Sequence, residues 1–269
     1  MSKKRLIICA LVLSVLQVNY TYLLGKNDVN SSPSNVDPNL DNYFTWFYKV
    51  LESNTPKPEY EVFTKALTGF FNLKAGNKIK NNLLTIIDFS LSSNMERMWI
   101  IDMNKLKVVN YSLVAHGRNS GDEYAKYFSN KPSSYQSSLG FYLTDDIYYG
   151  NHGMSLYLDG VEPDVNDNAR ERAIVIHGAN YVSRDFIRNY GRLGRSFGCP
   201  SIPMENHEEI ISMLSGRSCI YIYYPDEKYL NTSMMLTTEK VMAGIYCLLS
   251  EPSVTFDFYA ELLSIAGNY

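Results

Sequence analysis

A cysteine and a histidine in this sequence stand where a nucleophile and its base are expected. His177 follows the apolar run 174–176 and precedes Gly178, so a buried strand would deliver the imidazole to its own edge, where a general base is well placed. Cys199 lies 22 residues further along, in the Gly- and Pro-containing turn 196–200. A thiol beside an imidazole can exist as a thiolate at neutral pH, and the thiolate is the nucleophile. The pair therefore predicts covalent cysteine chemistry.

The other three histidines have less informative surroundings. His116 and His152 each adjoin a Gly-containing turn, where an imidazole either lines a cleft or only hydrogen-bonds to the backbone, and both interpretations stay open. His207 precedes two glutamates within an expected helix, which indicates a solvated or half-buried helix residue. We therefore expect the His207 helix to face away from the turn that bears Cys199.

Metal and serine chemistry are both disfavoured by residue spacing. Zinc sites favour short chelating pairs such as C-x₂-C or H-x₃-H, and neither the four histidines nor Cys199, Cys219 and Cys247 are spaced in that way. The stretch 117–121 reads G-R-N-S-G, which lacks the central serine of a G-x-S-x-G nucleophile elbow. We therefore expect no metal and no cofactor.

The remaining cysteines are predicted to be inert. Cys219 begins the apolar, β-rich run 219–224, and Cys247 lies within the apolar helical stretch 241–249. Both contexts are typical of small buried hydrophobic residues, in which a thiolate is costly. Cys199 is therefore expected to be the only reactive thiol.

The elements that must position Cys199 and His177 are mostly strands. Runs rich in β-branched and aromatic residues predict strands at 84–89, 98–102, 108–114, 139–143, 154–158, 173–177 and 219–224, the second and third of them forming a hairpin. Helical spacing of apolar residues predicts helices at 44–51, 60–71 and 241–249, and a further helix between Pro203 and Gly216. The pattern indicates a mainly β, mostly antiparallel domain with a few helices.

Composition and the first residues restrict the class of protein. With 269 residues, 45% hydrophobic and 20% charged, the chain is typical of a folded protein. The 25 basic and 28 acidic residues show no basic run beyond the first five positions, which disfavours a nucleic-acid partner. Lys3, Lys4 and Arg5 precede the apolar stretch 6–16, which predicts an export signal, either cleaved or kept as an anchor. The destination would be the periplasm or cell envelope.

Several motifs in the same order resemble those of the L,D-transpeptidases, the YkuD-type murein enzymes. The core of the resemblance is His177-Gly178 followed by the turn 196–200. The flanking stretches 114–121, 128–130, 137–142, 152–156 and 191–196 resemble the branch known as the murein L,D-transpeptidase catalytic domain. The resemblance runs from about residue 83 to 224 and implies a β-sandwich or barrel fold.

The resemblance implies a specific reaction on peptidoglycan stem peptides. Cys199 would attack the carbonyl of the third residue of a stem tetrapeptide, while His177 takes the thiol proton and later gives it to the leaving D-Ala. The backbone N–H groups of Gly198 and Cys199 would stabilise the oxyanion, and Ser196 would support that loop. The carbonyl of Gly178 would orient the imidazole. The product would be a thioester that is then transferred to an amine.

Substrate contacts are implied for four further residues. Arg192 and Arg195 are expected to hold stem carboxylates by bidentate pairing, with a purely structural role as the alternative. Tyr181 and His152 are expected to line the same substrate site. Carbapenems acylate L,D-transpeptidases of this type, so a covalent adduct on Cys199 is expected.

Departures from the common family pattern leave the fate of the thioester open. Phe197 stands where histidine is usual, Pro200-Ser201 stand where an apolar residue and Asn or Arg are usual, and the interval from histidine to cysteine is longer. Hydrolysis would make the protein an L,D-carboxypeptidase or a hydrolase of cross-links. A non-catalytic wall-binding module would need neither Cys199 nor His177, and a papain-like protease would carry its cysteine before its histidine.

The predicted organisation has five segments. They are an export signal or anchor at 1–20, a linker at 21–40, a helical segment packing on the core at 41–82, the catalytic domain at 83–224 and a helical tail at 225–269. No protein partner is inferred, and contact with the membrane is expected only if the first segment is not cleaved.

Overall fold

The structure is a computed structural model that describes residues 40–254. The predicted export signal and nearly all of the predicted linker lie outside the described residues, as does the end of the predicted tail. Within the described part of the chain, no helix combines the length and the apolar character that crossing a membrane requires.

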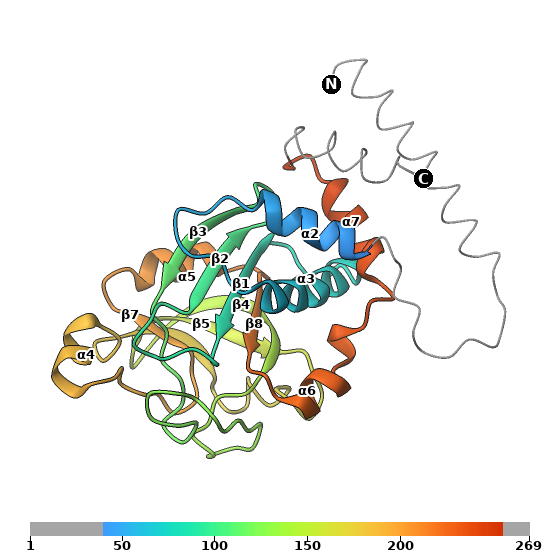
Figure 1. The fold of residues 1–269 in the computed structure, drawn as a ribbon. Coiled ribbons are helices and arrows are strands. Elements are labelled where there is room, and N and C mark those ends of the chain that lie inside the picture. Colours follow the sequence, from blue (N-terminus) through green and yellow to red (C-terminus); the bar gives the residue numbers. More distant parts are fainter. Residues whose placement is uncertain (1–39, 255–269) are drawn as a thin grey trace, which may run out of the picture. The chain divides into compact units, whose positions relative to one another are not determined.

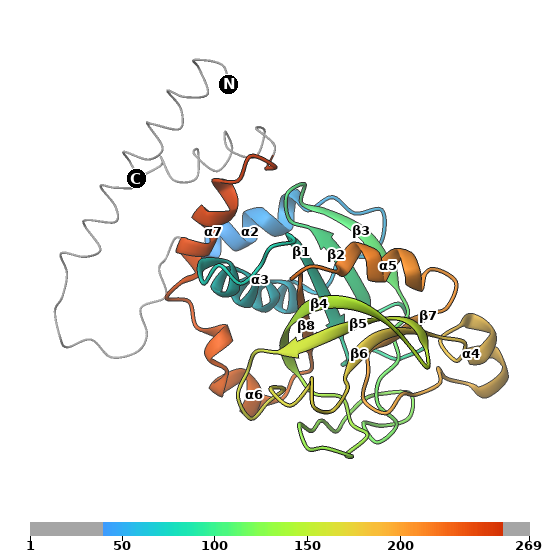
Figure 2. The same cartoon turned by 180° about the vertical axis from the view of Figure 1, so that it is seen from behind.

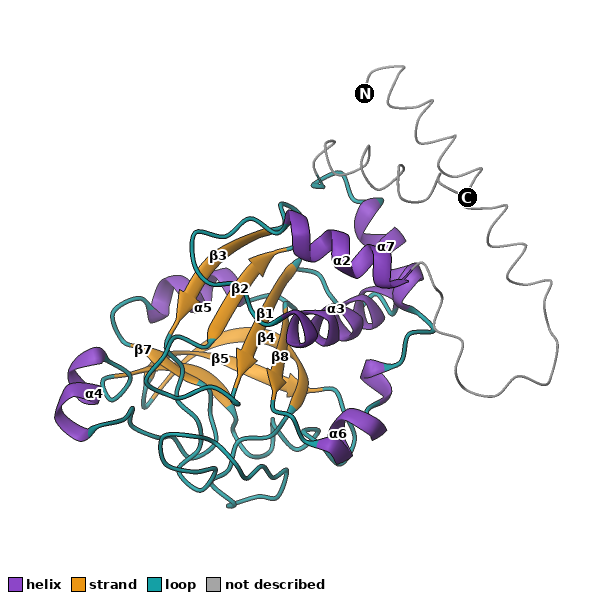
Figure 3. Ribbon diagram, in the orientation of Figure 1, coloured by secondary structure: helices purple, strands orange, loops and turns teal. Residues whose placement is uncertain are grey.

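Eight strands within residues 40–254 form one sheet, drawn in orange in Figure 3. Their order across the sheet is β3-β2-β1-β8-β4-β5-β6-β7. The strands are β1 (Leu83–Asp88), β2 (Met98–Asp102), β3 (Lys107–Ser112), β4 (Gly140–Gly150), β5 (Gly153–Gly160), β6 (Val175–Ala179), β7 (Ser201–Pro203) and β8 (Cys219–Tyr223).

The sheet is mostly antiparallel and nearly closes into a barrel. Only β1–β8 and β6–β7 pair in parallel among the described strands. Just past β3, Ala115 forms an antiparallel bridge with Ser201 of β7, at the opposite end of the strand order. The predicted mainly β fold with few helices is therefore confirmed, and β2 and β3 form the predicted antiparallel pair.

The helices lie outside the sheet. They are α2 (Leu40–Val50), α3 (Tyr60–Ala75), α4 (Arg184–Tyr190), α5 (His207–Leu214), α6 (Glu227–Thr232), the short 3₁₀ helix η1 (Met234–Leu236) and α7 (Val241–Leu249). Figures 1 and 2 show α2, α3 and α7 together at one side of the sheet, away from α4 and β7. The aromatic stripes of α2 and α3 are buried, and α3 approaches the sheet so closely that a Cβ at Gly69 would lie 2.1 Å from the ring of Phe141.

Two local predictions differ from the structure. The helix expected from Pro203 begins only at His207, because Pro203 ends the short strand β7. Cys247 is exposed and not buried as predicted. The period of α7 explains the error, since Val241, Ile245 and Leu248 face the core and leave Cys247 on the outer side.

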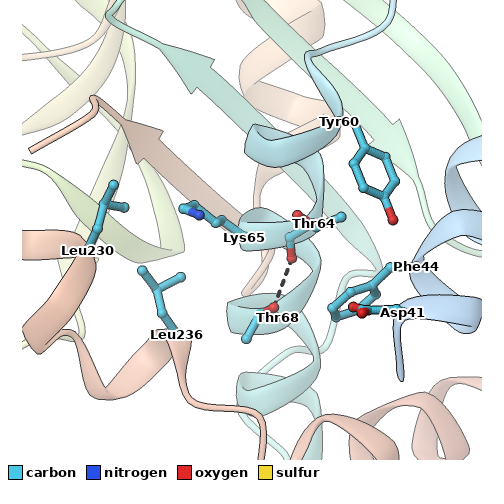
Figure 4. Close-up of a pocket in the computed structure, with 8 residues that line it drawn as sticks. All are labelled: Asp41, Phe44, Tyr60, Thr64, Lys65, Thr68, Leu230 and Leu236. Atoms are coloured by element: carbon cyan, nitrogen blue, oxygen red, sulfur yellow. Dashed lines mark hydrogen bonds between the residues drawn. The ribbon is translucent and has the colours of Figure 1, made fainter. Parts of the chain in front are cut away.

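A pocket of about 270 Å³ lies between α2, α3 and the C-terminal segment (Figure 4). Its lining residues are Asp41, Phe44, Tyr60, Thr64, Lys65, Thr68, Leu230 and Leu236. None of them is a cysteine or histidine, and none belongs to β6 or β7. The chemistry predicted from the sequence therefore lies elsewhere.

Candidate active site

His177 is held in the middle of β6, a strand whose five residues are all buried. On one side it stands opposite Ser155 of β5, and on the other opposite Ser201 of β7. Only 3% of His177 is exposed. Pairing on both sides fixes the backbone, so the position of the imidazole is set by the sheet.

The hydrogen bonds of His177 determine its tautomer. Nδ1 lies 3.0 Å from the carbonyl oxygen of Gly178. A carbonyl only accepts, so Nδ1 carries the hydrogen and the neutral ring presents a lone pair at Nε2. This is the contact that the family resemblance implied for Gly178. Nε2 lies 2.9 Å from Oγ of Ser201.

His177 is neutral at pH 7. Burial lowers the pKa of the imidazole, the Gly178 carbonyl raises it in part, and His152 and His207 lower it further. The ring of His152 stacks on His177, with centroids 4.2 Å apart and an angle of 19° between the planes. His152 is therefore brought to the site. A neutral imidazole with a lone pair on Nε2 is the form that can accept a proton.

Cys199 lies in the loop just before β7, with its sulfur at the start of β6. Its Sγ is 3.6 Å from the carbonyl oxygen of Ala173. Burial raises the pKa of the thiol, while the amides of Val175 and Cys199 and the charge of Arg172 lower it only in part. The raised pKa favours the neutral thiol, whereas an adjoining imidazole would favour the thiolate.

No hydrogen bond joins Cys199 to His177 among the described residues, although the β6–β7 register places them near each other. Cys199 precedes Ser201 by two positions, and Val175, whose amide lies beside the sulfur, precedes His177 by two. Two residues along a strand correspond to roughly 6–7 Å. Nε2 is occupied by Ser201, and the thiol faces Ala173.

The turn that carries Cys199 is fixed by Ser196. The Ser196 hydroxyl accepts from the N–H of Gly198 at 3.0 Å and donates to the carbonyl of Cys199 at 2.6 Å. Gly198 has a φ of 128°, and a Cβ there would lie 2.9 Å from the carbonyl oxygen of Gln136. The Gly198 N–H, expected to bind the oxyanion, is therefore occupied by Ser196 in this structure.

Arg172 is a member of the site that the sequence did not indicate. Its guanidinium donates to the carbonyls of Ser129 and Gln136 and to the hydroxyls of Ser134 and Ser138. A Cβ on Gly198 would lie 3.3 Å from its Nη2. In the sequence Arg172 belongs to a mixed-charge stretch that resembles a solvated loop, and its place just before a buried strand was the only signal.

Arg192 and Arg195 serve the fold of their loop. Arg195 Nη1 lies 2.7 Å from Oδ1 of Asp122 and also donates to the carbonyls of Arg118 and Gly121. Arg192 donates to the carbonyl of Leu193 and lies 3.8 Å from Asp122. The structural alternative describes both better than carboxylate binding. Tyr181, in contrast, reaches the site, since its hydroxyl lies 2.9 Å from that of Ser201.

The remaining two histidines differ from each other. His116 is 1% exposed, and its Nδ1 accepts from the guanidinium of Arg97 at 2.8 Å. Burial and the charge of Arg97 lower the pKa of His116 to about 3, which indicates a structural role. His207 packs against β6, because a Cβ on Gly178 would lie 2.6 Å from its ring. Only glycine at position 178 leaves room for this contact.

The exposed Phe197 and the half-buried Tyr135 form an aromatic pair beside Cys199 that contacts a cation. Phe197, two residues before Cys199, is 64% exposed and its ring lies 4.9 Å from that of Tyr135. The guanidinium of Arg118 lies 4.4 Å from the centre of the Tyr135 ring and 5.0 Å from that of Phe197. The departure at Phe197 thus provides an aromatic face for Arg118.

The described part of the chain contains no set of side chains that could bind a metal ion. Across residues 40–254, no three His, Cys, Asp or Glu side chains are grouped so that they could hold a metal ion. The groups that converge are a thiol, an imidazole, two hydroxyls and a guanidinium, which suit acyl transfer.

Comparisons with known proteins identify the family of this domain. Residues 54–223 match the family model of the L,D-transpeptidase catalytic domain. No curated protein matches. Among solved structures, an L,D-transpeptidase from Mycobacterium smegmatis is 12% identical, covering 53% of this chain and 59% of that chain, with a TM-score of 0.33.

Two further solved structures are similar to the same degree. The L,D-transpeptidase LdtMt1 in complex with imipenem is 12% identical over 53% of this chain and 59% of that chain, with a TM-score of 0.32. An L,D-transpeptidase (Yku) from Stackebrandtia nassauensis is 8% identical over 72% of this chain and 95% of that chain, with a TM-score of 0.33. The match therefore spans 59% of the length of the first two structures.

Proposed function

The chain belongs to the L,D-transpeptidase catalytic-domain family, and on that premise we propose that it is an exported peptidoglycan L,D-transpeptidase with Cys199 as nucleophile and His177 as general base. One observation carries the assignment. A buried, neutral imidazole with its hydrogen on Nδ1 presents its Nε2 lone pair at the strand edge where the Cys199 loop arrives. That arrangement supports proton abstraction from the thiol.

The first half-reaction forms a thioester. The Cys199 side chain turns from the Ala173 carbonyl toward Nε2 of His177, and the sulfur attacks the carbonyl carbon of the third stem residue as the thiol proton passes to Nε2. The bond to D-Ala then breaks, and the same proton goes from Nε2 to the leaving amine. Since the pKa of the thiol is raised, the base must act during the attack.

The N–H of Cys199 serves as the oxyanion donor. It lies beside the sulfur, whereas the N–H of Gly198 already donates to Ser196. Gly198 contributes the backbone conformation that aims the next amide, and Ser196 fixes the turn.

Arg118 is the cation that binds the carboxylate of the departing D-Ala. A tetrapeptide donor ends in a free carboxylate one residue beyond the scissile bond, so a cation is needed close to the nucleophile. The guanidinium groups of Arg172 and Arg195 are held by several acceptors each. The exposed guanidinium of Arg118 has no hydrogen-bond partner among the described residues, and Phe197 and Tyr135 hold it beside the turn. We assign it the role expected of Arg192 and Arg195.

The test is incubation of the purified protein with disaccharide-tetrapeptide, followed by mass analysis of protein and products. A thioester on the Cys199 peptide, release of D-Ala and a cross-linked dimer are expected. Tripeptide without dimer would show an L,D-carboxypeptidase. The absence of both D-Ala release and a thioester would refute an enzyme of this class. Cys199→Ala should abolish the reaction, and the matched control Cys247→Ala should retain it, because Cys247 lies on the outer face of α7.

A carbapenem provides an independent probe of the nucleophile. A covalent adduct is expected on the Cys199 peptide of the wild-type protein and of Cys247→Ala, and none on Cys199→Ala. An adduct found on Cys247 alone would contradict the assignment. Simple alkylating agents are a poorer probe, because the exposed Cys247 thiol competes for them.

A further inference from the structure

Two hydroxyl groups connect the buried base to the half-buried rim of the site. Oγ of Ser201 lies 2.9 Å from Nε2 of His177, and the hydroxyl of Tyr181 lies 2.9 Å from Oγ of Ser201. Ser201 is fully buried as the first residue of β7, and Tyr181 lies in the loop that follows β6. The three side chains form a continuous row across the β6–β7 pair.

The direction of every hydrogen bond in this row follows from the Gly178 carbonyl. Because Nδ1 donates to that carbonyl, Nε2 of the neutral ring can only accept. The single proton of Ser201 must therefore point to Nε2, so Oγ of Ser201 accepts from Tyr181. The resting order is Tyr181 to Ser201 to His177.

The same row can serve the protonated imidazole. The Ser201 proton first turns from Nε2 to the oxygen of Tyr181, which frees the single Nε2 lone pair. Nε2 then takes the thiol proton, becomes a donor, and Oγ of Ser201 accepts from it. Tyr181 is only partly buried, so its proton can turn to water. No bond to carbon or sulfur changes in these rotations, and each hydroxyl proton stays bonded to its own oxygen.

The other groups that face His177 cannot do this. His152 stacks on the ring and His207 packs against Gly178, and both disfavour a positive charge on His177. Cys199 supplies the proton, and Arg172 is a permanent cation near the thiol. Apart from the reacting groups, the hydroxyl row is what offers a charged Nε2 an acceptor among the described residues.

We propose that Ser201 and Tyr181 are positioning residues of the acylation step, forming a reversible hydroxyl relay that orients His177 and stabilises its imidazolium form. This inference rests on the proposed role of His177 as base. It gives a function to Ser201, whose hydroxyl is buried on β7 beside His177.

The relay predicts a shift in the pKa of His177 on removal of the Ser201 hydroxyl. A hydrogen bond to a charged group is worth more than one to a neutral group, so Ser201→Ala should lower the pKa of His177 by about one pH unit. Ser201→Thr keeps the hydroxyl and should restore the wild-type value, and Tyr181→Phe should shift the pKa in the same direction by less.

The experiment has one readout that does not depend on activity. Nuclear magnetic resonance of the histidine side chains across a pH titration, on full-length Cys199→Ala with and without Ser201→Ala, measures the tautomer and pKa of His177. An unchanged pKa in Ser201→Ala, or resting hydrogen on Nε2 of His177, would overturn the relay. Circular dichroism checks that each variant is folded.

Acylation rates over the same pH range supply the second readout. Ser201→Ala should slow acylation about ten-fold or more and move the acid limb of the profile to lower pH, while Ser201→Thr restores both. A loss of rate without a shift of the limb would indicate a structural role only and would overturn the proposal. If His177→Ala acylates normally, the proposed function fails, whatever the pKa readout shows for the relay.

Discussion

Two buried imidazoles in this fold are held in opposite ways. His116 accepts from the guanidinium of Arg97 through Nδ1 and has its Nε2 3.3 Å from the carbonyl of Gly121, so its hydrogen is on Nε2. His177 has its hydrogen on Nδ1 and faces a hydroxyl with Nε2. Burial lowers the pKa of both rings.

The difference lies in the partner of the lone pair. A guanidinium has no acceptor and cannot reverse its hydrogen bond, so protonation of His116 would place two positive groups together in the core. A hydroxyl can turn from donor to acceptor, so protonation of His177 leaves every group paired. Burial alone therefore does not distinguish the two rings; the reversibility of their hydrogen bonds does.

The strongest test of this contrast is removal of each imidazole. General-base assistance is typically worth a factor of about 10² to 10⁴, so His177→Ala should slow acylation by about that much with the fold intact. His116→Ala should leave the acylation rate of the folded fraction nearly unchanged. The comparison needs the acylation rates of all four His→Ala variants, with circular dichroism to check that each variant is folded. Loss of acylation in His116→Ala or His152→Ala, with retention in His177→Ala, would show that the base is misassigned.

Stability should respond in the opposite order. His116→Ala leaves the buried guanidinium of Arg97 without one acceptor and opens a cavity, so the free energy of unfolding should fall by about 3 kcal/mol. His207→Ala, at a half-buried helix position, should cost about 1 kcal/mol or less. Denaturant unfolding measures both. Equal losses would mean that the Arg97–His116 contact contributes little to stability.

The pH dependence of stability should carry the signature of His116. The unfolded imidazole binds a proton near pH 6.5 and the folded one only near pH 3, so between these values the unfolded state holds more protons and acidification destabilises the protein. From pH 7 to 4.5 this amounts to about 3 kcal/mol. His116→Gln removes the titration and should flatten that part of the curve. If His116→Gln shows the wild-type dependence of unfolding free energy on pH, the low pKa belongs to a group other than His116.

The arginines extend the contrast with a smaller effect. Arg118→Ala removes a cation with no internal hydrogen bond and should lower kcat/KM for the tetrapeptide about ten-fold, mainly through KM, without loss of stability. Arg195→Ala breaks internal contacts with Gly121 and Asp122 and should lower the melting temperature. Kinetics with tetrapeptide and thermal unfolding of both variants show which arginine binds substrate and which stabilises the fold. A stability loss in Arg118→Ala with an unchanged KM would reverse the two roles.

The sequence by itself determined most of the strands and the main helices, and it indicated Cys199 and His177 as the candidate pair. Alternation and β-branched runs predicted most of the strands, and α7 agrees with the predicted stretch 241–249, because these signals depend on neighbours a few residues away. The Gly-containing turn of Cys199 and the strand of His177 were recognisable for the same reason.

Only the tertiary structure decided how the pair is supported. β7 has three residues, follows Pro200 and ends at Pro203, so it resembles a turn until it pairs with β6. That pairing joins Ser201 to His177 and Tyr181. The place of Arg172, the contact of His207 with Gly178 and the thiol form of Cys199 likewise depend on burial among residues distant in the chain. Hydrogen-bond partners and desolvation are set by such long-range packing, which local periodicity does not encode.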